Sequence, residues 1–527
     1  MGLSRREVIK AGVFAGAALS LPLSRVVSGQ SALANRMPSS KLPKPFTTPF
    51  GMPPVAMPFR TDATTDYYDI TMTATKLEVI PGFQTTFFAY NGSVPGPTIK
   101  VNRGRKVVVR HRNALPNVHP TLGYEPWTSV HLHGSASLPQ FDGYASDVTH
   151  PGQYKDYHYP NVQPARTLWY HDHGVFHTAE NAYHGLVAQY HLLDQAEQAL
   201  PIPHGKYDVP LLIGDALFNS DGSLLFTLDD QSGLWGDVIL VNGRPWPVMQ
   251  VERRKYRFRI CGVAVSRSWR FSLDSGDPMV VIATDGGLMP APQSVTSFRA
   301  ASAERYEVII DFSKYPIGRR VVLRNSSPTN NQNYTNTDKV MAFDVVSDAT
   351  DMSNNSIPDV LDPGNAVMAL QPSQAVRTRK FKFERDNGQW AINGTTWKNV
   401  VDSGYKFSLA KPNLGDIEIW ELQNSSGGWF HPVHMHLTDF KVLDRNGRPP
   451  FAHELGPKDV VYVGEGEKVR VMMKWEGRGR YMMHCHNLIH EDHDMMAQFE
   501  VIDPAGDGDD PIGTVARPSS DEANDPL

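Results

Sequence analysis

Short runs in which apolar and polar side chains alternate dominate the chain. This alternation is the period of a β-strand with one buried face, whereas the 3.6-residue spacing of an amphipathic helix is weak throughout. Turn-forming residues bound the runs, as expected for short strands. The pattern therefore predicts an all-β protein built of sandwiches or barrels. Clear examples of such runs are residues 106–110, 256–260, 416–422 and 468–473.

An Asn-Gly pair recurs at equal intervals. Asn91, Asn242 and Asn393 each precede a glycine, and the two intervals between these asparagines are both 151 residues long. An Asn-Gly pair favours a tight hairpin, and its return at domain-length spacing indicates three copies of one unit. A chain of 527 residues is long enough for three domains of ordinary size. We expect linkers near residues 194–207 and 348–375.

The first 34 residues have the pattern of an export signal. Ser4, Arg5, Arg6 and Lys10 precede an apolar stretch over residues 11–23, which is too short to span a membrane. The Ser-Arg-Arg-x-x-x-Lys order is typical of a twin-arginine signal, and an ordinary basic signal peptide is the alternative. We therefore expect export through the twin-arginine machinery to the periplasm, the cell envelope or the extracellular space.

Charge excludes some classes of partner. The 51 basic and 56 acidic side chains give a net charge of −5, without a nucleic-acid or polybasic membrane signature. No later segment is apolar for long enough to cross a bilayer. Residues 506–527 are acidic and poor in large apolar side chains, so we expect a disordered tail there. We expect the protein to be a monomer.

Histidine is concentrated in four clusters. No histidine lies between His204 and His431, so the clusters fall only in the first and third units. Residues two apart on a strand point to the same side, and each His-x-His pair can therefore direct two imidazoles at one metal. A shared metal site is expected where the two units meet. The clustered histidines are His131, His133, His171, His173, His431, His434, His436, His484, His486 and His490.

The last cluster also contains a cysteine. A thiolate with two imidazoles and a weak axial thioether is the ligand set of a blue-copper electron-transfer site. On a strand, the sulfur of Cys485 points away from the imidazoles of His484 and His486, which would face a second site. Eight further imidazoles suit a cluster of three coppers. The blue-copper candidates are His431, Cys485, His490 and Met495.

Several longer stretches carry a family resemblance. They include residues 131–135, 165–173, 235–238, 304–308, 336–340 and 484–496. The chain resembles the multicopper oxidase family, and within it bilirubin oxidases more than spore-coat laccases. The resemblance implies three cupredoxin-like domains, at residues 35–195, 205–350 and 375–505, with no copper ligand in the second. It also implies four copper ions: type 1 at His431, Cys485, His490 and Met495; type 2 at His131 and His434; type 3 at His133, His171, His173, His436, His484 and His486.

Two acids and one aromatic residue are further candidates. Reduction of dioxygen to water consumes protons, and residues matching Asp142 and Glu491 relay protons in similar oxidases. The alternative for Asp142 is a turn-forming role, and for Glu491 the orientation of a ligand. His431 is expected to turn an imidazole edge towards a donor pocket. Trp429 would form an aromatic wall of that pocket or serve only in packing.

The expected reaction is oxidation of a small organic donor by dioxygen. The resemblance implies phenols, aromatic amines or tetrapyrroles such as bilirubin as donors, one-electron transfers at the type 1 copper and four-electron reduction of dioxygen to water. A metallo-oxidase for Cu(I) or Mn(II) is the alternative enzyme. A non-catalytic copper-binding or envelope protein is an alternative of another class, but no expected ligand is missing from the chain.

Overall fold

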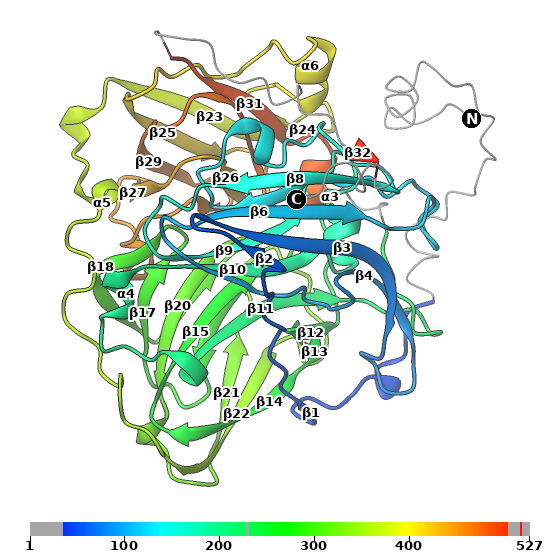
Figure 1. Cartoon of the computed structure of the whole chain (residues 1–527), viewed down its shortest axis with the longest axis vertical. Coiled ribbons are helices and arrows are strands. Elements are labelled where there is room, and N and C mark those ends of the chain that lie inside the picture. Colours follow the sequence, from blue (N-terminus) through cyan, green and yellow to red (C-terminus); the bar gives the residue numbers. More distant parts are fainter. Residues whose placement is uncertain (1–34, 228–230, 504–516, 519–527) are drawn as a thin grey trace.

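The computed structural model describes residues 35–227, 231–503 and 517–518; the predicted signal peptide lies outside them. Six β-sheets account for three successive domains, which confirms the predicted all-β class (Figure 1). Helices are short, and among the described residues none has both the length and the apolar character of a membrane span. The α-helices of the described residues are α3 (Thr178–Tyr183), α4 (Gln195–Gln198), α5 (Ala366–Ala369), α6 (Trp397–Asp402) and α7 (Leu488–Asp492).

The first domain contains two facing sheets. The strand order is β2-β3-β6-β8-β32 in one sheet, with β4 paired to β3, and β5-β10-β9-β7 in the other. Along β3 buried and less buried side chains alternate, as on a strand with one face in the core, whereas every residue of β9 is buried. The strands are β2 (Arg60–Thr61), β3 (Thr65–Leu77), β4 (Thr85–Tyr90), β5 (Ile99–Asn102), β6 (Lys106–Asn113), β7 (Val130–His133), β8 (Gln153–Tyr159), β9 (Arg166–Asp172), β10 (Val187–Leu193) and β32 (Arg517–Pro518).

The second domain has a seven-stranded and a six-stranded sheet. Their orders are β13-β12-β11-β15-β20-β17-β18 and β1-β14-β22-β21-β16-β19. In Figure 1 this domain is the green part of the chain at the bottom of the view. Its strands are β1 (Thr48–Pro49), β11 (Asp208–Ala216), β12 (Val238–Val241), β13 (Arg244–Pro245), β14 (Pro247–Arg253), β15 (Lys255–Gly262), β16 (Trp269–Leu273), β17 (Met279–Thr284), β18 (Gly287–Val295), β19 (Ser297–Ala300), β20 (Arg305–Asp311), β21 (Arg320–Asn325) and β22 (Lys339–Asp348).

The third domain again pairs two sheets, yellow to red in Figure 1. Their strand orders are β24-β23-β25-β29-β27 and β28-β26-β30-β31. Its core is rich in aromatic residues and includes the side chains of Cys485 and Met495. The strands are β23 (Arg377–Asp386), β24 (Gln389–Ile392), β25 (Ile417–Asn424), β26 (His431–Met435), β27 (Phe440–Arg445), β28 (Val460–Val463), β29 (Lys468–Lys474), β30 (Gly479–Cys485) and β31 (Met496–Val501).

The three Asn-Gly pairs form the same turn in each domain. Asn91, Asn242 and Asn393 have φ angles of 50°, 50° and 51°, in the left-handed region that asparagine tolerates well. Each side-chain oxygen accepts a hydrogen bond from the backbone of a neighbouring strand, at 2.7, 2.9 and 2.7 Å. The repeat seen in the sequence is therefore a repeat of one structural element.

Two segments lie differently from the expectation. β1 falls within the predicted first domain, yet it pairs in parallel with β14 and so extends a sheet of the second domain. Arg517–Pro518 falls within the predicted disordered tail, yet it pairs antiparallel with β8 at Gln153 and Tyr154. Backbone pairing, which side-chain composition does not report, orders both segments. The rest of the tail lies outside the described residues.

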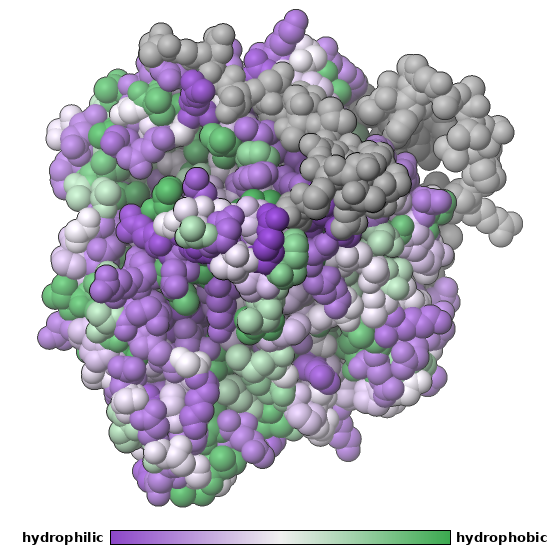
Figure 2. Space-filling model, in the orientation of Figure 1, coloured by the Kyte–Doolittle hydropathy of each residue, from purple (hydrophilic) through white to green (hydrophobic). Residues whose placement is uncertain are grey.

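The first and third domains meet along their histidine-bearing strands. α3 of the first domain packs against α7 of the third, where the Asp492 carboxylate accepts bonds from the backbone of Thr178 and Ala179 at 3.2 and 2.8 Å. On the face shown in Figure 2, hydrophilic and hydrophobic residues are interspersed. The clustered histidines are buried, so the candidate chemistry is internal, at the junction of the domains.

Candidate metal centre

Two pairs of neighbouring strands position eight of the clustered imidazoles. In the first domain β7 lies beside β9 with His131 opposite His171, and in the third β26 lies beside β30 with His434 opposite His484. The second histidine of each pair is at or just beyond the end of its strand. The alternation of side chains therefore turns both members of each His-x-His pair towards the junction.

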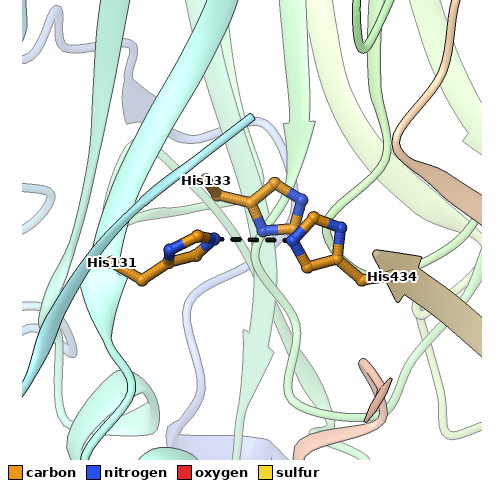
Figure 3. Close-up of side chains that lie close together, drawn as sticks. All are labelled: His131, His133 and His434. Atoms are coloured by element: carbon orange, nitrogen blue, oxygen red, sulfur yellow. Dashed lines mark hydrogen bonds between the residues drawn. The ribbon is translucent and has the colours of Figure 1, made fainter. Parts of the chain in front are cut away.

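The imidazoles gather into compact groups at this junction. The Nε2 atoms of His131 and His434 are 3.4 Å apart, and Figure 3 shows these two rings facing each other with His133 beside them. His484 Nε2 lies 3.2 Å from the Nε2 atoms of both His173 and His436. Within each group one possible ligand atom per residue lies within 4.8 Å of the others: His131, His133 and His434; His133, His171 and His486; His173, His436 and His484.

The ring nitrogens that face away from these groups are fixed by oxygen acceptors. Backbone carbonyls face the Nδ1 atoms of His131 (Asp142, 2.5 Å), His171 (Asp172, 2.8 Å) and His434 (Asp459, 2.8 Å). Carboxylates face the Nδ1 atoms of His436 (Asp142, 2.7 Å) and His484 (Glu491, 2.8 Å). Such partners fix the tautomer and direct the lone pair of the other nitrogen at a metal.

The donor set fits a metal cluster. Burial lowers the pKa values of seven imidazoles far enough to keep them neutral, as metal ligands must be: His131, His133, His171, His173, His434, His436 and His486. His133 Nδ1, His171 Nε2 and His486 Nε2 are buried without a hydrogen-bond partner. A bound metal would provide the missing partner for these buried nitrogens, whose rings converge on one another.

Cys485 belongs to a separate group. Its Sγ lies 3.3 Å from His431 Nδ1 and 3.5 Å from His490 Nδ1, and these two nitrogens are 3.3 Å apart. Burial raises the pKa of the Cys485 thiol well above its ordinary value, so the thiolate needs a bound cation. The side chain of Met495 is buried in the same core. An S/N/N triangle with a neighbouring thioether is typical of a blue-copper site.

Comparison with known proteins agrees with this donor set. Models of the multicopper oxidase family match residues 71–195, 205–346 and 368–505. The chain belongs to the multicopper oxidase family. A bilirubin oxidase of Albifimbria verrucaria is 42% identical over 481 residues, 86% of this chain and 81% of that protein. A laccase of Bacillus subtilis is 34% identical over 516 residues, 87% and 99% of the two chains. A multicopper oxidase structure from Pediococcus acidilactici superposes with a TM-score of 0.78 at 29% identity, covering 88% and 93%.

The family expected from the sequence is thereby confirmed. The protein is a copper oxidoreductase that uses dioxygen and is similar to bilirubin oxidases and laccases. Its histidine clusters are consistent with a type 1 site and a trinuclear site. The three family matches also agree with three cupredoxin-type domains, and the exact domain boundaries stay a prediction.

Both predicted acids lie against clustered histidines. Oδ2 of the Asp142 carboxylate accepts a hydrogen bond from His436 Nδ1, and its second oxygen, Oδ1, is buried without a hydrogen-bond partner. Burial raises the pKa of Asp142 well above its usual range. Burial also opposes ionisation of Glu491, but His484 and His173 lower its pKa to about 2. One acid therefore favours its protonated form and the other its ionised form.

The surroundings of His431 show what would separate its imidazole from a donor. The residue is fully buried, so its imidazole edge does not face an open donor pocket. The hydroxyl of Ser426 lies 2.8 Å from His431 Nε2 and covers that edge. Trp429 is partly exposed, and its ring centroid lies 6.0 Å from that of Trp390 and 6.2 Å from that of His490. A donor at this surface would meet Trp429 and Ser426 before the imidazole.

Sequence reasoning missed several residues of the site. The Trp390 ring lies 4.0 Å from that of His490 and is buried. The carbonyl of Ser232, in the second domain, accepts a bond from His490 Nε2 at 2.8 Å. The Asp459 carboxylate lies 3.1 Å from His133 Nε2. None of these residues belongs to a repeated motif, so only the spatial arrangement identifies them.

Proposed function

We propose that this oxidase takes electrons from a small aromatic donor at the Cys485 site and passes them to dioxygen at the eight-histidine cluster. The proposed ligands are those expected from the sequence, for four copper ions per chain. Type 1 copper would bind His431, Cys485, His490 and Met495; type 2 copper His131 and His434; the type 3 pair His133, His171, His173, His436, His484 and His486. Bound copper would supply one-electron transfer from the donor and four-electron reduction of dioxygen to water.

One observation carries this proposal. Cys485 lies in a group with His431 and His490, while its chain neighbours His484 and His486 lie in two other groups of imidazoles. The backbone from residue 484 to 486 is thus a covalent connection between all three groups. It provides a short route for electrons from the donor side to the dioxygen side.

The two acids would relay protons to the imidazole cluster. Asp142 contacts His436, and Glu491 contacts His484 at 2.8 Å with His173 at 3.5 Å. Both carboxylates are buried, so each exchanges protons with solvent through neighbouring groups rather than directly. A buried acid within hydrogen-bond reach of the reacting centre satisfies the geometric requirement for proton transfer.

The donor surface suits a flat organic molecule. Trp429 offers a partly exposed aromatic ring next to Trp390 and His490. The four methionines nearest the cysteine motif, Met482, Met483, Met495 and Met496, are all buried and present no thioether to a Cu(I) substrate at the surface. The named relatives include a bilirubin oxidase and a laccase. We therefore infer bilirubin, phenols or aromatic amines as donors, in preference to Cu(I) or Mn(II).

Copper content and oxygen uptake test the function together. Purified protein should contain about four coppers per chain, show a blue absorption band and consume dioxygen with an aromatic diamine. kcat/KM is then compared between organic donors and Cu(I), with free copper controlled by a chelator. Copper binding without oxygen uptake would favour a copper-binding envelope protein, and a clear preference for Cu(I) would favour a metallo-oxidase.

Export is proposed on the sequence alone. The Ser-Arg-Arg-x-x-x-Lys order at residues 4–10 supports the twin-arginine route to the periplasm, cell envelope or extracellular space. This route transports folded proteins, which suits a chain whose ligands come from two distant domains.

A further inference from the structure

Arg305 joins all three domains through one buried guanidinium. Its Nε donates to the Thr167 carbonyl of the first domain at 3.1 Å. In its own domain, the carbonyls of Ala303 and Asp285 accept bonds from Nη1 and Nη2 at 3.0 and 3.2 Å. The two remaining donors bind Asp459 of the third domain, Nη1 to Oδ1 at 2.6 Å and Nη2 to Oδ2 at 2.5 Å. All five N–H groups of the side chain are thus satisfied.

Asp459 connects this guanidinium to two of the clustered imidazoles. Its Oδ1, besides accepting from Arg305, lies 3.1 Å from His133 Nε2. Its backbone carbonyl lies 2.8 Å from His434 Nδ1. Because an ionised carboxylate only accepts, His133 carries its proton on Nε2, which leaves Nδ1 bare. Nδ1 is the buried nitrogen of His133 without a hydrogen-bond partner.

The backbone beside His133 is adapted to this contact. Gly134 has a φ of +89°, and a Cβ there would lie 2.5 Å from Arg305 Nη2 and 2.7 Å from Asp459 Oδ2. A side chain would therefore displace the ion pair. The absence of a Cβ lets the guanidinium and carboxylate approach the strand end that presents His133.

Neighbouring charges fix the position of the pair. The Asp285 carboxylate accepts from the Arg305 backbone N–H at 2.6 Å and lies 3.0 Å from Lys458 Nζ. Lys458 is also 3.0 Å from Glu304, and each of these charged side chains is buried. A buried network whose members are all bonded leaves little freedom for Asp459 to rotate.

We propose that Arg305 is a positioning residue for the dioxygen-reducing cluster: through Asp459 it fixes the tautomer and ring orientation of His133. The histidine-free second domain thereby takes part in building a metal site to which it supplies no ligand. The inference rests on the proposed assignment of His133 as a copper ligand. Arg305 would not contact substrate or metal itself.

The test compares copper binding in three variants of the full chain. Arg305→Gln removes the charge, and Arg305→Lys retains the charge but not the forked geometry. Arg445→Gln is the matched control, because Arg445 is a buried arginine that binds Glu454 through two bonds of 2.8 and 2.5 Å. No described contact connects Arg445 to a clustered histidine. Each protein is depleted of copper and titrated against a competing chelator, recording total bound copper, blue absorption and melting temperature.

Both Arg305 variants should bind the non-blue copper about 10- to 100-fold more weakly, the usual effect of losing a ligand-orienting partner. Blue absorption per chain should stay at the wild-type level. Arg445→Gln should lower the melting temperature and leave copper affinity unchanged. Wild-type affinity for non-blue copper in the Arg305 variants would overturn the inference, as would a loss of blue and non-blue copper in parallel. If Arg305→Gln does not fold, Arg305→Lys decides by the same criteria. Wild-type protein that binds no non-blue copper would instead refute the proposed function.

Discussion

Replacing Asp142 with Asn should separate proton delivery from electron delivery. The carboxylate uses Oδ2 to accept from His436 Nδ1 at 2.7 Å, and its Oδ1 lies buried 3.5 Å from His131 Nδ1. The asparagine oxygen can replace Oδ2, so the orientation of His436 is retained. The backbone carbonyl that accepts from His131 Nδ1 at 2.5 Å is unchanged.

The contacts of Asp142 allow its effect on folding stability and its effect on the reaction rate to be compared. The asparagine NH2 group would occupy the position of Oδ1, buried and without an acceptor, which costs about 1–3 kcal/mol of stability. Loss of a positioned proton donor slows the proton-dependent step about 10²- to 10⁴-fold. This slowing corresponds to an activation barrier higher by about 2.7 to 5.4 kcal/mol. The kinetic effect should thus exceed the effect on folding.

Rapid mixing can measure the two half-reactions separately. Donor should bleach the blue band of Asp142→Asn anaerobically at the wild-type rate, while return of the band on mixing with dioxygen should be slower. Asp147→Asn serves as the control, because Asp147 is a buried acid of the same loop region that pairs with Lys155. Reoxidation at the wild-type rate in Asp142→Asn would refute proton delivery by this residue. Loss of copper from the variant would favour a purely structural role.

Three further results are expected. Cys485→Ser should bleach the blue colour and abolish turnover, and an unchanged absorption spectrum would exclude Cys485 as a ligand. Changing Arg5 and Arg6 to Lys should retain the protein in the cytoplasm, whereas normal export in fractionated cells would favour the general secretory route. Burial opposes ionisation of Glu454, but Arg445 lowers its pKa from 4.5 to about 2. Its ionisation therefore stabilises the fold above pH 4.5, and this contribution is lost as the pH falls to about 2. Between pH 4.5 and about 2, the free energy of unfolding should therefore fall by about 3 kcal/mol less in Glu454→Gln than in the wild-type protein. Identical acid unfolding curves for the two proteins would contradict the prediction.

The sequence predicted features that depend on local rules. Alternation of side chains identified the strands, and the same rule showed that Cys485 and its neighbours His484 and His486 face different sites. In the structure Cys485, His484 and His486 each lie in a different group of possible metal ligands, as expected. That the hydroxyl of Ser426 lies against the His431 imidazole was not foreseen, because no local pattern specifies the path of the loop that carries Ser426. The pairing of β1 with β14 was not predicted, because the two strands lie about two hundred residues apart in the chain.

The orientation of the imidazoles explains why the rest of the site was invisible in the sequence. A histidine that binds metal through one nitrogen needs an acceptor at the other. Here many acceptors are backbone carbonyls, such as those of Asp142, Asp459 and Ser232. Every residue has a carbonyl, so residue type gives no signal for which one is used. The second domain lacks clustered histidines and was therefore predicted to supply no ligand. The second domain nevertheless takes part in the site, because its Ser232 carbonyl accepts from His490 and its Arg305 holds Asp459, the acceptor in the third domain.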